Sequence, residues 1–178
     1  GTAMKLIKKL LAMALAGVML LTILTGCSGG KTGDRLVEEY LATYYHDLNA
    51  YKDKPITHDV PEIKTVAEKF DPSLLASNGI GFNASVIYGS TLPESLLQLK
   101  SALANYSNCT NVYLYAMEVP DGMSELTQVT LLLNHSGPYV AYTNRTTTFS
   151  SIKCASTLVK KAGKQYRLVV FIQVPTAS

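Results

Sequence analysis

The stretch "STLVKKAGKQYRLVVFIQV", residues 156–174, decides the fold class of this chain. Two runs rich in Val, Leu and Thr flank the short segment "KKAGK" at 160–164, which carries a glycine and three lysines. Runs of β-branched and aromatic residues on both sides of a Gly-containing turn are typical of a β-hairpin. We therefore expect an antiparallel hairpin here, with "QYRLVVFIQV" at 165–174 as the last strand.

More strands are expected upstream of this hairpin. Alternating apolar residues in "NVYLYAMEV" at 111–119 predict a strand, and "LTQVTLLLN" at 126–134 predicts a second one after the turn "PDGMS". Residues 139–161, rich in Thr, Ser and Val, are interpreted as one long or bulged strand system, and residues 82–88 as a short strand. This half of the chain therefore predicts an antiparallel sheet.

The first half of the chain predicts three helices, over residues 34–51, 60–70 and 91–106. Apolar residues of the first helix recur at spacings of four and three, and Asp34 is a suitable N-cap. Thr91 and Glu94 have the spacing of a capping box at the start of the third. Helices followed by strands indicate an α+β fold, with N-terminal helices packed on one face of a curved antiparallel sheet of about four to six strands.

The first 26 residues predict a secretory signal. Lys5, Lys8 and Lys9 precede an uncharged run from Leu10 to Leu24, whereas Gly1 to Ala3 look like an expression remnant or an upstream extension. A transmembrane anchor is the alternative, because uncharged residues continue to Gly30. The end of the run favours the signal.

That end, Leu24-Thr25-Gly26-Cys27, resembles the lipobox of bacterial lipoproteins. The resemblance implies that Cys27 is thioether-linked to a diacylglyceryl group and becomes the first residue after cleavage. Two acyl chains hold a protein stably on a bilayer. We therefore expect a signal peptide at 1–26, a lipidated Cys and flexible tether at 27–33, and a single α+β domain at 34–178. The expected location is the extracytoplasmic face of the bacterial cell membrane, with membrane lipid as the partner of Cys27.

Charge and cysteine content narrow the possibilities further. Three of the 16 basic residues lie in the signal, which leaves 13 basic against 13 acidic residues. The mature chain therefore lacks the basic excess of a nucleic-acid-binding protein. Cys109 and Cys154 remain after Cys27, and an even count in an exported protein predicts a disulfide, with two unpaired thiols as the alternative.

The order of the elements is similar to that of the nuclear-transport-factor-2-like fold, over roughly residues 34–174. The most similar part is the terminal strand-turn-strand, where Tyr166 stands in place of the family's usual Trp. The resemblance implies that a long helix and two shorter ones close one side of a curved sheet around a conical pocket. Enzymes of the isomerase or dehydratase kind occur among relatives of this fold.

Tyrosine is the candidate binding residue, since the chain has eleven tyrosines and no tryptophan. Tyrosines on a concave sheet are able to hold a small molecule, glycan or peptide by stacking and hydroxyl bonds. The alternative is that they fill the rim of the core. The ligand-pocket candidates are Tyr113, Tyr115, Tyr139, Tyr142 and Tyr44.

Catalytic chemistry has little support in the sequence. His46, His58 and His135 form no metal-binding or catalytic motif, and we expect no catalytic residue, metal or cofactor. The leading hypothesis is a non-enzymatic lipoprotein domain that binds a ligand or an envelope protein partner. The alternatives are a small pocket enzyme of the isomerase or dehydratase kind and a structural envelope lipoprotein without a pocket.

Overall fold

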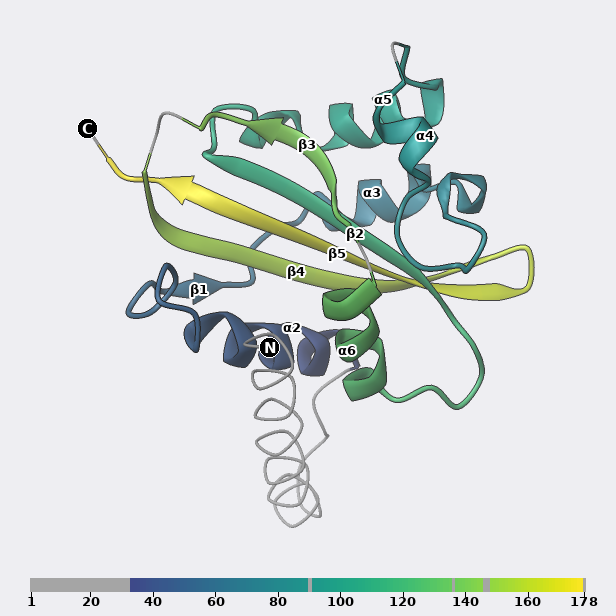
Figure 1. The fold of residues 1–178 in the computed structure, drawn as a ribbon, viewed down its shortest axis with the longest axis horizontal. Helices are drawn as coiled ribbons and strands as arrows, with labels where there is room; N and C mark the ends of the chain where they lie inside the picture. The colour runs from purple at the N-terminus through teal and green to yellow at the C-terminus, as the bar shows by residue number, and fades with distance from the viewer. Residues whose placement is uncertain (1–32, 90, 136, 146–147, 178) are drawn as a thin grey trace.

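A computed structural model describes residues 33–89, 91–135, 137–145 and 148–177, and these residues form an α+β fold (Figure 1). Its centre is a five-stranded sheet with the strand order β1-β4-β5-β2-β3. The strands are β1 (Ile56–Thr57), β2 (Asn111–Val119), β3 (Tyr139–Thr143), β4 (Phe149–Lys161) and β5 (Lys164–Pro175). The expected fold class and number of strands are confirmed.

The predicted C-terminal hairpin is present and forms the spine of the sheet. Strands β4 and β5 pair antiparallel along their whole length, down to the pair Lys161 and Lys164. Ala162 and Gly163 between them have φ angles of 50° and 79°, the left-handed conformation that a two-residue hairpin turn requires. Strand β2 pairs antiparallel with β5 on one side and with β3 on the other. The two-residue β1 adds a parallel pair with β4, so the sheet is mixed where an antiparallel one was expected.

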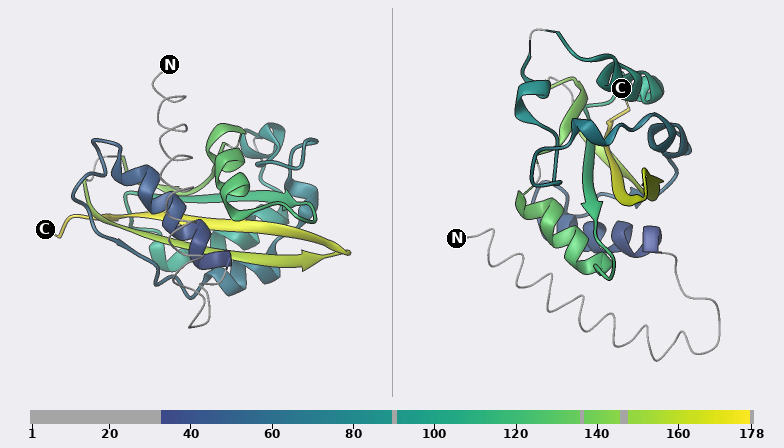
Figure 2. Two further views of the ribbon diagram at one scale, coloured as in Figure 1. Left: turned by 90° about the horizontal axis from the view of Figure 1, so that it is seen from below. Right: turned by 90° about the vertical axis from the view of Figure 1, so that its right-hand side faces the viewer.

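Helices cover both faces of the sheet, which differs from the expected packing on one face (Figure 2). Helices α2 (Gly33–His46) and α6 (Glu125–His135) lie side by side on one face. Helices α3 (Ile63–Lys69), α4 (Ala84–Ile87) and α5 (Glu94–Ala102) lie on the other, with the short 3-10 turns η1 (Pro72–Leu74) and η2 (Ala104–Tyr106). Side chains alternate across a strand, so each face has its own core.

We name these cores for contrast by the side chains at the centre of each, although the aliphatic core also contains Phe70, Phe82, Tyr139 and Tyr166. The aliphatic core, under α3 and α5, contains Leu96, Leu99, Leu103, Val112 and Leu114, all fully buried. The aromatic core, under α2 and α6, contains Tyr45 and Phe171 together with Met117 and Val169. Strands β2 and β5 contribute to both cores. Their even-numbered residues face the aliphatic core, and their odd-numbered residues face the aromatic core.

The predicted strand at 126–134 is wrong, because this segment forms helix α6. The hydroxyl of Ser124 accepts a hydrogen bond from the backbone N–H of Thr127 at 3.2 Å, which caps the first turn. The buried residues Gln128, Val129 and Leu132 then recur at helical spacing against the sheet. The run of leucines fits the period of a helix as well as that of a strand. The N-cap at Ser124 is the local feature that favours the helix.

The predicted strand at 82–88 is also wrong. Asn83 caps the short helix α4 by accepting a hydrogen bond from Ser85 N–H, and only a single bridge joins Phe82 to Leu75. Three helices are confirmed but shorter than predicted, since α2 ends at His46, α3 begins at Ile63 and α5 begins at Glu94 without a side-chain cap. The long strand predicted at 139–161 is divided into β3 and β4.

The predicted signal, the lipobox with Cys27 and the tether up to residue 32 lie outside the described residues. Among the helices that are described, none is both long enough and apolar enough to cross a bilayer.

Candidate functional site

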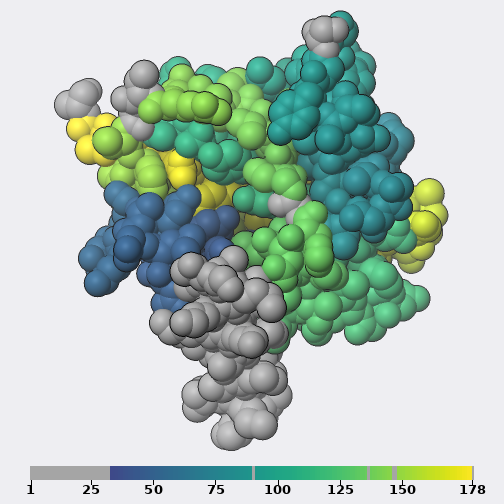
Figure 3. All heavy atoms as spheres, viewed as in Figure 1, coloured from purple at the N-terminus to yellow at the C-terminus, as the bar shows by residue number. Residues whose placement is uncertain are grey.

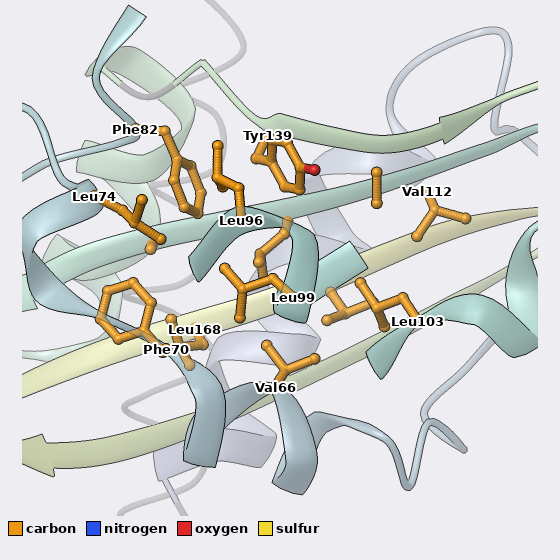
Figure 4. Packing of buried hydrophobic residues seen from close by; sticks show 14 of the residues in the cluster. Val66, Phe70, Leu74, Phe82, Leu96, Leu99, Leu103, Val112, Tyr139 and Leu168 are labelled. Atoms are coloured by element: carbon orange, nitrogen blue, oxygen red, sulfur yellow. The ribbon is translucent and has the colours of Figure 1, made fainter. Parts of the chain in front are cut away.

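The sheet separates the five tyrosines that are the ligand-pocket candidates. Tyr44, Tyr113 and Tyr115 lie on the aromatic side, whereas Tyr139 and Tyr142 lie on the aliphatic side. Tyr139 is buried in the aliphatic core, with its ring 5.6 Å from that of Phe82 (Figure 4). Tyr142 donates its hydroxyl hydrogen to the carbonyl of Lys100 in α5 at 3.0 Å. The five candidates therefore do not share one side of the sheet.

The three tyrosines on the aromatic side belong to a larger group of rings. Tyr44 and Tyr45 come from the last turn of α2, Tyr51 from the following loop, Tyr113 and Tyr115 from β2, Phe149 from β4 and Phe171 from β5. Tyr45 stacks on Phe171 at 4.3 Å, and Tyr51 lies 4.9 Å from Tyr45 and 5.4 Å from Phe149. The apolar face of α2 and the odd-numbered residues of β2 thus bring together aromatic residues that are far apart in the sequence.

Part of this group reaches the molecular surface. Tyr45 and Phe171 are buried, but the rings above and beside them are half-buried. We call these five half-buried rings the aromatic surface: Tyr44, Tyr51, Tyr113, Tyr115 and Phe149. In Figure 3, yellow atoms of β5 are visible between the blue N-terminal segment and the teal and green strands, at this end of the sheet.

A chain of polar side chains crosses the sheet beside these rings. Thr143 donates from its hydroxyl to Oδ1 of Asn111 at 2.7 Å, and the Asn111 amide donates to Oε1 of Gln173. Gln173, although only 5 % exposed, donates from Nε2 to the hydroxyl of Tyr51 at 2.9 Å. The amides hold one another in a fixed orientation, so the ring of Tyr51 is positioned from below.

An apolar crevice continues from the aromatic surface between α2 and α6. It is lined by residues of both helices and by the sheet beneath them: Leu41, Tyr45, Tyr115, Leu132, Leu133, Val169 and Phe171. The hydroxyls of Tyr45 and Tyr115 lie 3.4 Å apart within it. The crevice has room for about one water molecule, so it is much narrower than the conical pocket that the resemblance implied.

Three hydroxyls of the aromatic surface, those of Tyr51, Tyr113 and Tyr115, are neutral at physiological pH. Burial raises the pKa of Tyr51, of Tyr115 and of Tyr113 above the ordinary value, and the nearby Arg145 lowers that of Tyr113 only in part. Neutral phenols both donate and accept hydrogen bonds. The surface therefore combines flat apolar faces with polar edges.

A buried ion network lies beneath α2, away from the aromatic surface. Arg167 of β5 is only 1 % exposed, and its guanidinium donates to Gln128 of α6 at 2.8 Å, to Ser156 of β4 at 3.0 Å and to the carboxylate of Asp34. Asp34 belongs to the first turn of α2. This network therefore joins both helices to the sheet.

A second buried carboxylate adjoins this network. Oε1 of Glu38 accepts a hydrogen bond from the backbone N–H of Ser156 at 3.0 Å, and its Oε2 lies 3.1 Å from Nδ1 of His58. The same Nδ1 lies 2.9 Å from the backbone carbonyl of Cys154. Glu38 is 7 % exposed, and its hydrogen bonds and ion pairs compensate for the loss of water.

Glu38, His58 and Cys154 are the residue types of a catalytic cysteine with its base, but their geometry differs from such a site. His58 contacts the backbone of Cys154, and burial, with a further contribution from Glu38, raises the pKa of the Cys154 thiol far above its ordinary value. A nucleophilic cysteine requires the opposite shift. Among the described residues, no group of three or more His, Cys, Asp or Glu side chains is placed to hold a metal ion. What the network does in the structure is to join α2 and the loop that contains His58 to strand β4.

The expected disulfide between Cys109 and Cys154 is not formed, and both thiols are free. Cys154 belongs to the aromatic core, whereas Cys109 packs against the aliphatic core on the opposite face of the sheet. Burial raises the pKa of both thiols. The even count of cysteines was therefore a misleading signal.

Phe149, Gln173 and the place of Tyr51 beside them were not predicted from the sequence. Tyr51 continues the apolar stripe of α2 by sequence spacing, and Gln173 is the polar residue within an apolar strand, so both carried a signal. Phe149 carried none, because residues 139–161 were interpreted as one long or bulged strand system. No family model, curated protein or solved structure matches the chain.

Proposed function

We propose that the chain is a lipid-anchored extracytoplasmic domain that binds a ligand through the aromatic surface and has no catalytic activity of its own. The observation that carries the proposal is the gathering of five half-buried rings at one end of one sheet face. On the aliphatic side Tyr139 and Tyr166 are covered at 3 % and 5 % exposure, and the half-buried Tyr106 and Tyr142 donate their hydroxyls to Glu62 and Lys100 rather than gathering with other half-buried rings. Aromatic side chains with a wet polar edge are enriched at binding sites.

The rings of the aromatic surface are held in place by neighbouring side chains, and this favours a role in binding. Tyr51 is held by Tyr45, Phe149 and Phe171 through ring contacts and by Gln173 through a hydrogen bond. A ring that is already fixed loses little conformational entropy when a ligand covers it. The aromatic surface is thus preorganised for an incoming ligand.

The proposed anchor keeps this surface close to a membrane. Helix α2 is described from Gly33 onward, so five residues, 28–32, lie between it and Cys27. A chain of that length spans at most about 20 Å. The ligand would then be a component of the cell envelope or a molecule that reaches it.

The anchor is tested by metabolic labelling with a fatty-acid probe. Cys27→Ala should lose the label, while Cys109→Ala should label like the parent protein, because only Cys27 follows the lipobox pattern. Equal labelling of Cys27→Ala and the parent would reject the anchor. Binding itself is tested by titrating the full chain with short oligosaccharides and short peptides while tyrosine fluorescence is followed. A panel that leaves the fluorescence unchanged would remove the support for the binding function.

A further inference from the structure

We propose that the outer edge of strand β4, at residues 157–161, is a docking site for an extended acidic segment of another protein, which adds to the sheet as a further strand. The site is separate from the aromatic surface and lies next to the turn of the β4–β5 hairpin. Three observations carry the proposal: the direction of the backbone groups along β4, the groups among them that have no partner, and the lysines beside them.

Even-numbered residues of β4 direct their backbone groups toward the outer edge of the sheet. The N–H of Ile152 donates at 2.9 Å to the segment that leads into β1. Further along, the carbonyl of Cys154 lies 2.9 Å from Nδ1 of His58, and the N–H of Ser156 donates to Glu38 at 3.0 Å. Backbone groups of successive residues in a strand point to opposite edges. The side chains of His58 and Glu38 therefore take the place of a neighbouring strand.

The edge is open beyond Ser156. By the same alternation, Leu158 and Lys160, which lie opposite Arg167 and Gln165 of β5, each direct an N–H and a C=O outward. Within the described part of the chain, these four groups have no hydrogen-bond partner. The turn of the hairpin projects past the helices (Figures 1 and 2), and the side chain of Leu158 is 37 % exposed. An extended chain that lies along this edge gains main-chain hydrogen bonds.

Lysines beside the edge indicate the charge of the partner. Residues 156–165 contain Lys160, Lys161 and Lys164 and no acidic residue. Exposed lysines on an edge strand oppose the pairing of two identical edges. Opposite charges in cross-strand pairs are stabilising, whereas like charges directly opposite each other are destabilising. The edge therefore favours an acidic segment over a second copy of itself.

Acidic residues of the chain also lie near the hairpin turn. Glu118 and Asp121 line an open hollow together with Lys160 and Lys164, and the carboxylate of Glu118 is 3.3 Å from Nζ of Lys164. Lys161 lies outside this wall and donates at 2.8 Å to a backbone carbonyl of α3, which is a neutral acceptor. Helix α3 itself carries two lysines and one glutamate. The surroundings of the open edge are thus positive on balance.

The side chains of the edge specify the order of residues in the partner. Residues directly opposite each other in an antiparallel pair interact. Acidic residues suit the positions opposite Lys161 and Lys160, and apolar residues suit those opposite the half-buried Val159 and the exposed Leu158. The hexapeptide Thr-Glu-Glu-Val-Leu-Thr has this order when it runs antiparallel to β4.

The test titrates this peptide, labelled with fluorescein, with the full chain while fluorescence anisotropy and amide hydrogen exchange are followed. The amides of Leu158 and Lys160 should exchange rapidly in the free protein, and the bound peptide should slow both. The peptide Thr-Lys-Lys-Val-Leu-Thr should bind about tenfold more weakly, because it places like charges opposite the lysines.

N-methylated peptides test the backbone hydrogen bonds themselves. Methylation of both the second glutamate and the leucine removes the two N–H groups that face the edge, and it should weaken binding about tenfold or more. Methylation of the valine removes an N–H that points away from the edge, so this peptide should bind like the unmodified one.

Matched protein variants separate docking from folding. Leu158→Pro removes an N–H that β5 does not use, and proline is tolerated at such edge positions, so the variant should keep its circular dichroism spectrum and bind about tenfold more weakly. Lys160→Glu should weaken binding of the acidic peptide severalfold and strengthen that of the lysine peptide. Lys52→Glu changes an exposed lysine in the loop between α2 and β1 and should bind both peptides like the parent protein. The charge variants and the methylated peptides remain decisive if Leu158→Pro does not fold.

Each contrary outcome removes a different part of the proposal. Slow exchange of the Leu158 and Lys160 amides without peptide, together with a dimeric mass in solution, would assign the edge to a second copy and overturn the acidic partner. Equal binding of the two charge-reversed peptides would overturn the acidic class. Equal binding of all methylated peptides, or unchanged exchange of both amides, would overturn strand addition. The proposed function at the aromatic surface is tested separately and does not depend on these results.

Discussion

The two faces of the central sheet differ in what they bury. On the aliphatic side, Leu96, Leu99 and Leu103 of the α5 segment pack on even-numbered residues of β2 and β5 without measurable exposure. On the aromatic side, the odd-numbered residues of the same strands meet rings, a buried arginine and two carboxylates. One pair of strands thus separates a dry core from a polar and partly open one.

The difference between the faces assigns them different roles. Closely packed aliphatic groups give the largest stabilisation per residue, because their burial carries no polar desolvation cost. Buried ions and half-exposed rings stabilise less for the same area, since their desolvation opposes their interactions. We therefore expect the aliphatic face to supply most of the folding stability and the aromatic face to supply specificity and binding.

The first prediction tests the aliphatic face directly. Leu99→Ala should reduce the free energy of unfolding by about 3 to 4 kcal/mol, because Leu99 is fully buried and the cavity cannot refill. Denaturant unfolding followed by circular dichroism measures the loss. Leu97→Ala, in the same helix but 43 % exposed, is the matched control and should cost less than about 1 kcal/mol. Similar losses for the two variants would contradict the assignment of stability to this face.

The second prediction concerns the ion network on the aromatic face. Asp34→Ala leaves the guanidinium of Arg167 buried without its carboxylate, and the expected loss is about 2 kcal/mol. This is less than for a fully buried pair, because the Asp34 side chain is 42 % exposed and water screens part of the interaction.

Two further variants show whether the ion pair is responsible. Asp121→Ala, at an exposed turn residue, is the control and should leave the unfolding midpoint unchanged. Combining Asp34→Ala with Arg167→Met removes both charges and should regain part of the loss, since the buried cation is then gone. The losses in the free energy of unfolding are compared with those of Asp34→Ala alone and Arg167→Met alone. A loss in the double variant larger than the sum of the two single losses would show that Arg167 acts mainly through Gln128 and Ser156.

The fold was predictable where local chemistry and tertiary packing agree. The hairpin turn at 160–164 needs left-handed backbone at Ala162 and Gly163. The runs on either side of it are rich in residues that favour strands, and they pair with each other in the structure. Helix α2 was readable from its apolar stripe for the same reason. The segment 126–134 was misread because its leucines fit both periods, and its cap, Ser124 with Thr127, is a weak signal within a turn.

The candidate site was predictable only within one strand. Alternation places Tyr113 and Tyr115 on the same face, and the structure confirms this. The face of Tyr139 and Tyr142 was not predictable, because helix α6 intervenes and the register between β2 and β3 shifts between Val112 and Tyr113. Arg167 in the otherwise apolar last strand was the readable sign of a buried network, although its partners come from distant segments.

The last prediction concerns a polar atom in the dry core. The hydroxyl of Tyr139 is buried on the aliphatic side, and within the described part of the chain it has no hydrogen-bond partner (Figure 4). Burying an unpaired hydroxyl costs about 1 to 3 kcal/mol, whereas the ring itself packs favourably. Tyr139→Phe removes the hydroxyl and keeps the ring, so we expect it to raise the free energy of unfolding by about 1 kcal/mol.

Tyr142→Phe is the matched control for this change, because its hydroxyl is bonded. The Tyr142 hydroxyl donates to the Lys100 carbonyl at 3.0 Å, and its removal leaves that carbonyl without this donor. The expected loss is about 1 kcal/mol, the usual net contribution of one hydrogen bond. The same atom is removed in both variants, so opposite signs in thermal melts would isolate the effect of pairing from that of the ring. A destabilised Tyr139→Phe would show that the hydroxyl has a partner in solution, such as a buried water, and that this side of the sheet is less dry than its packing indicates.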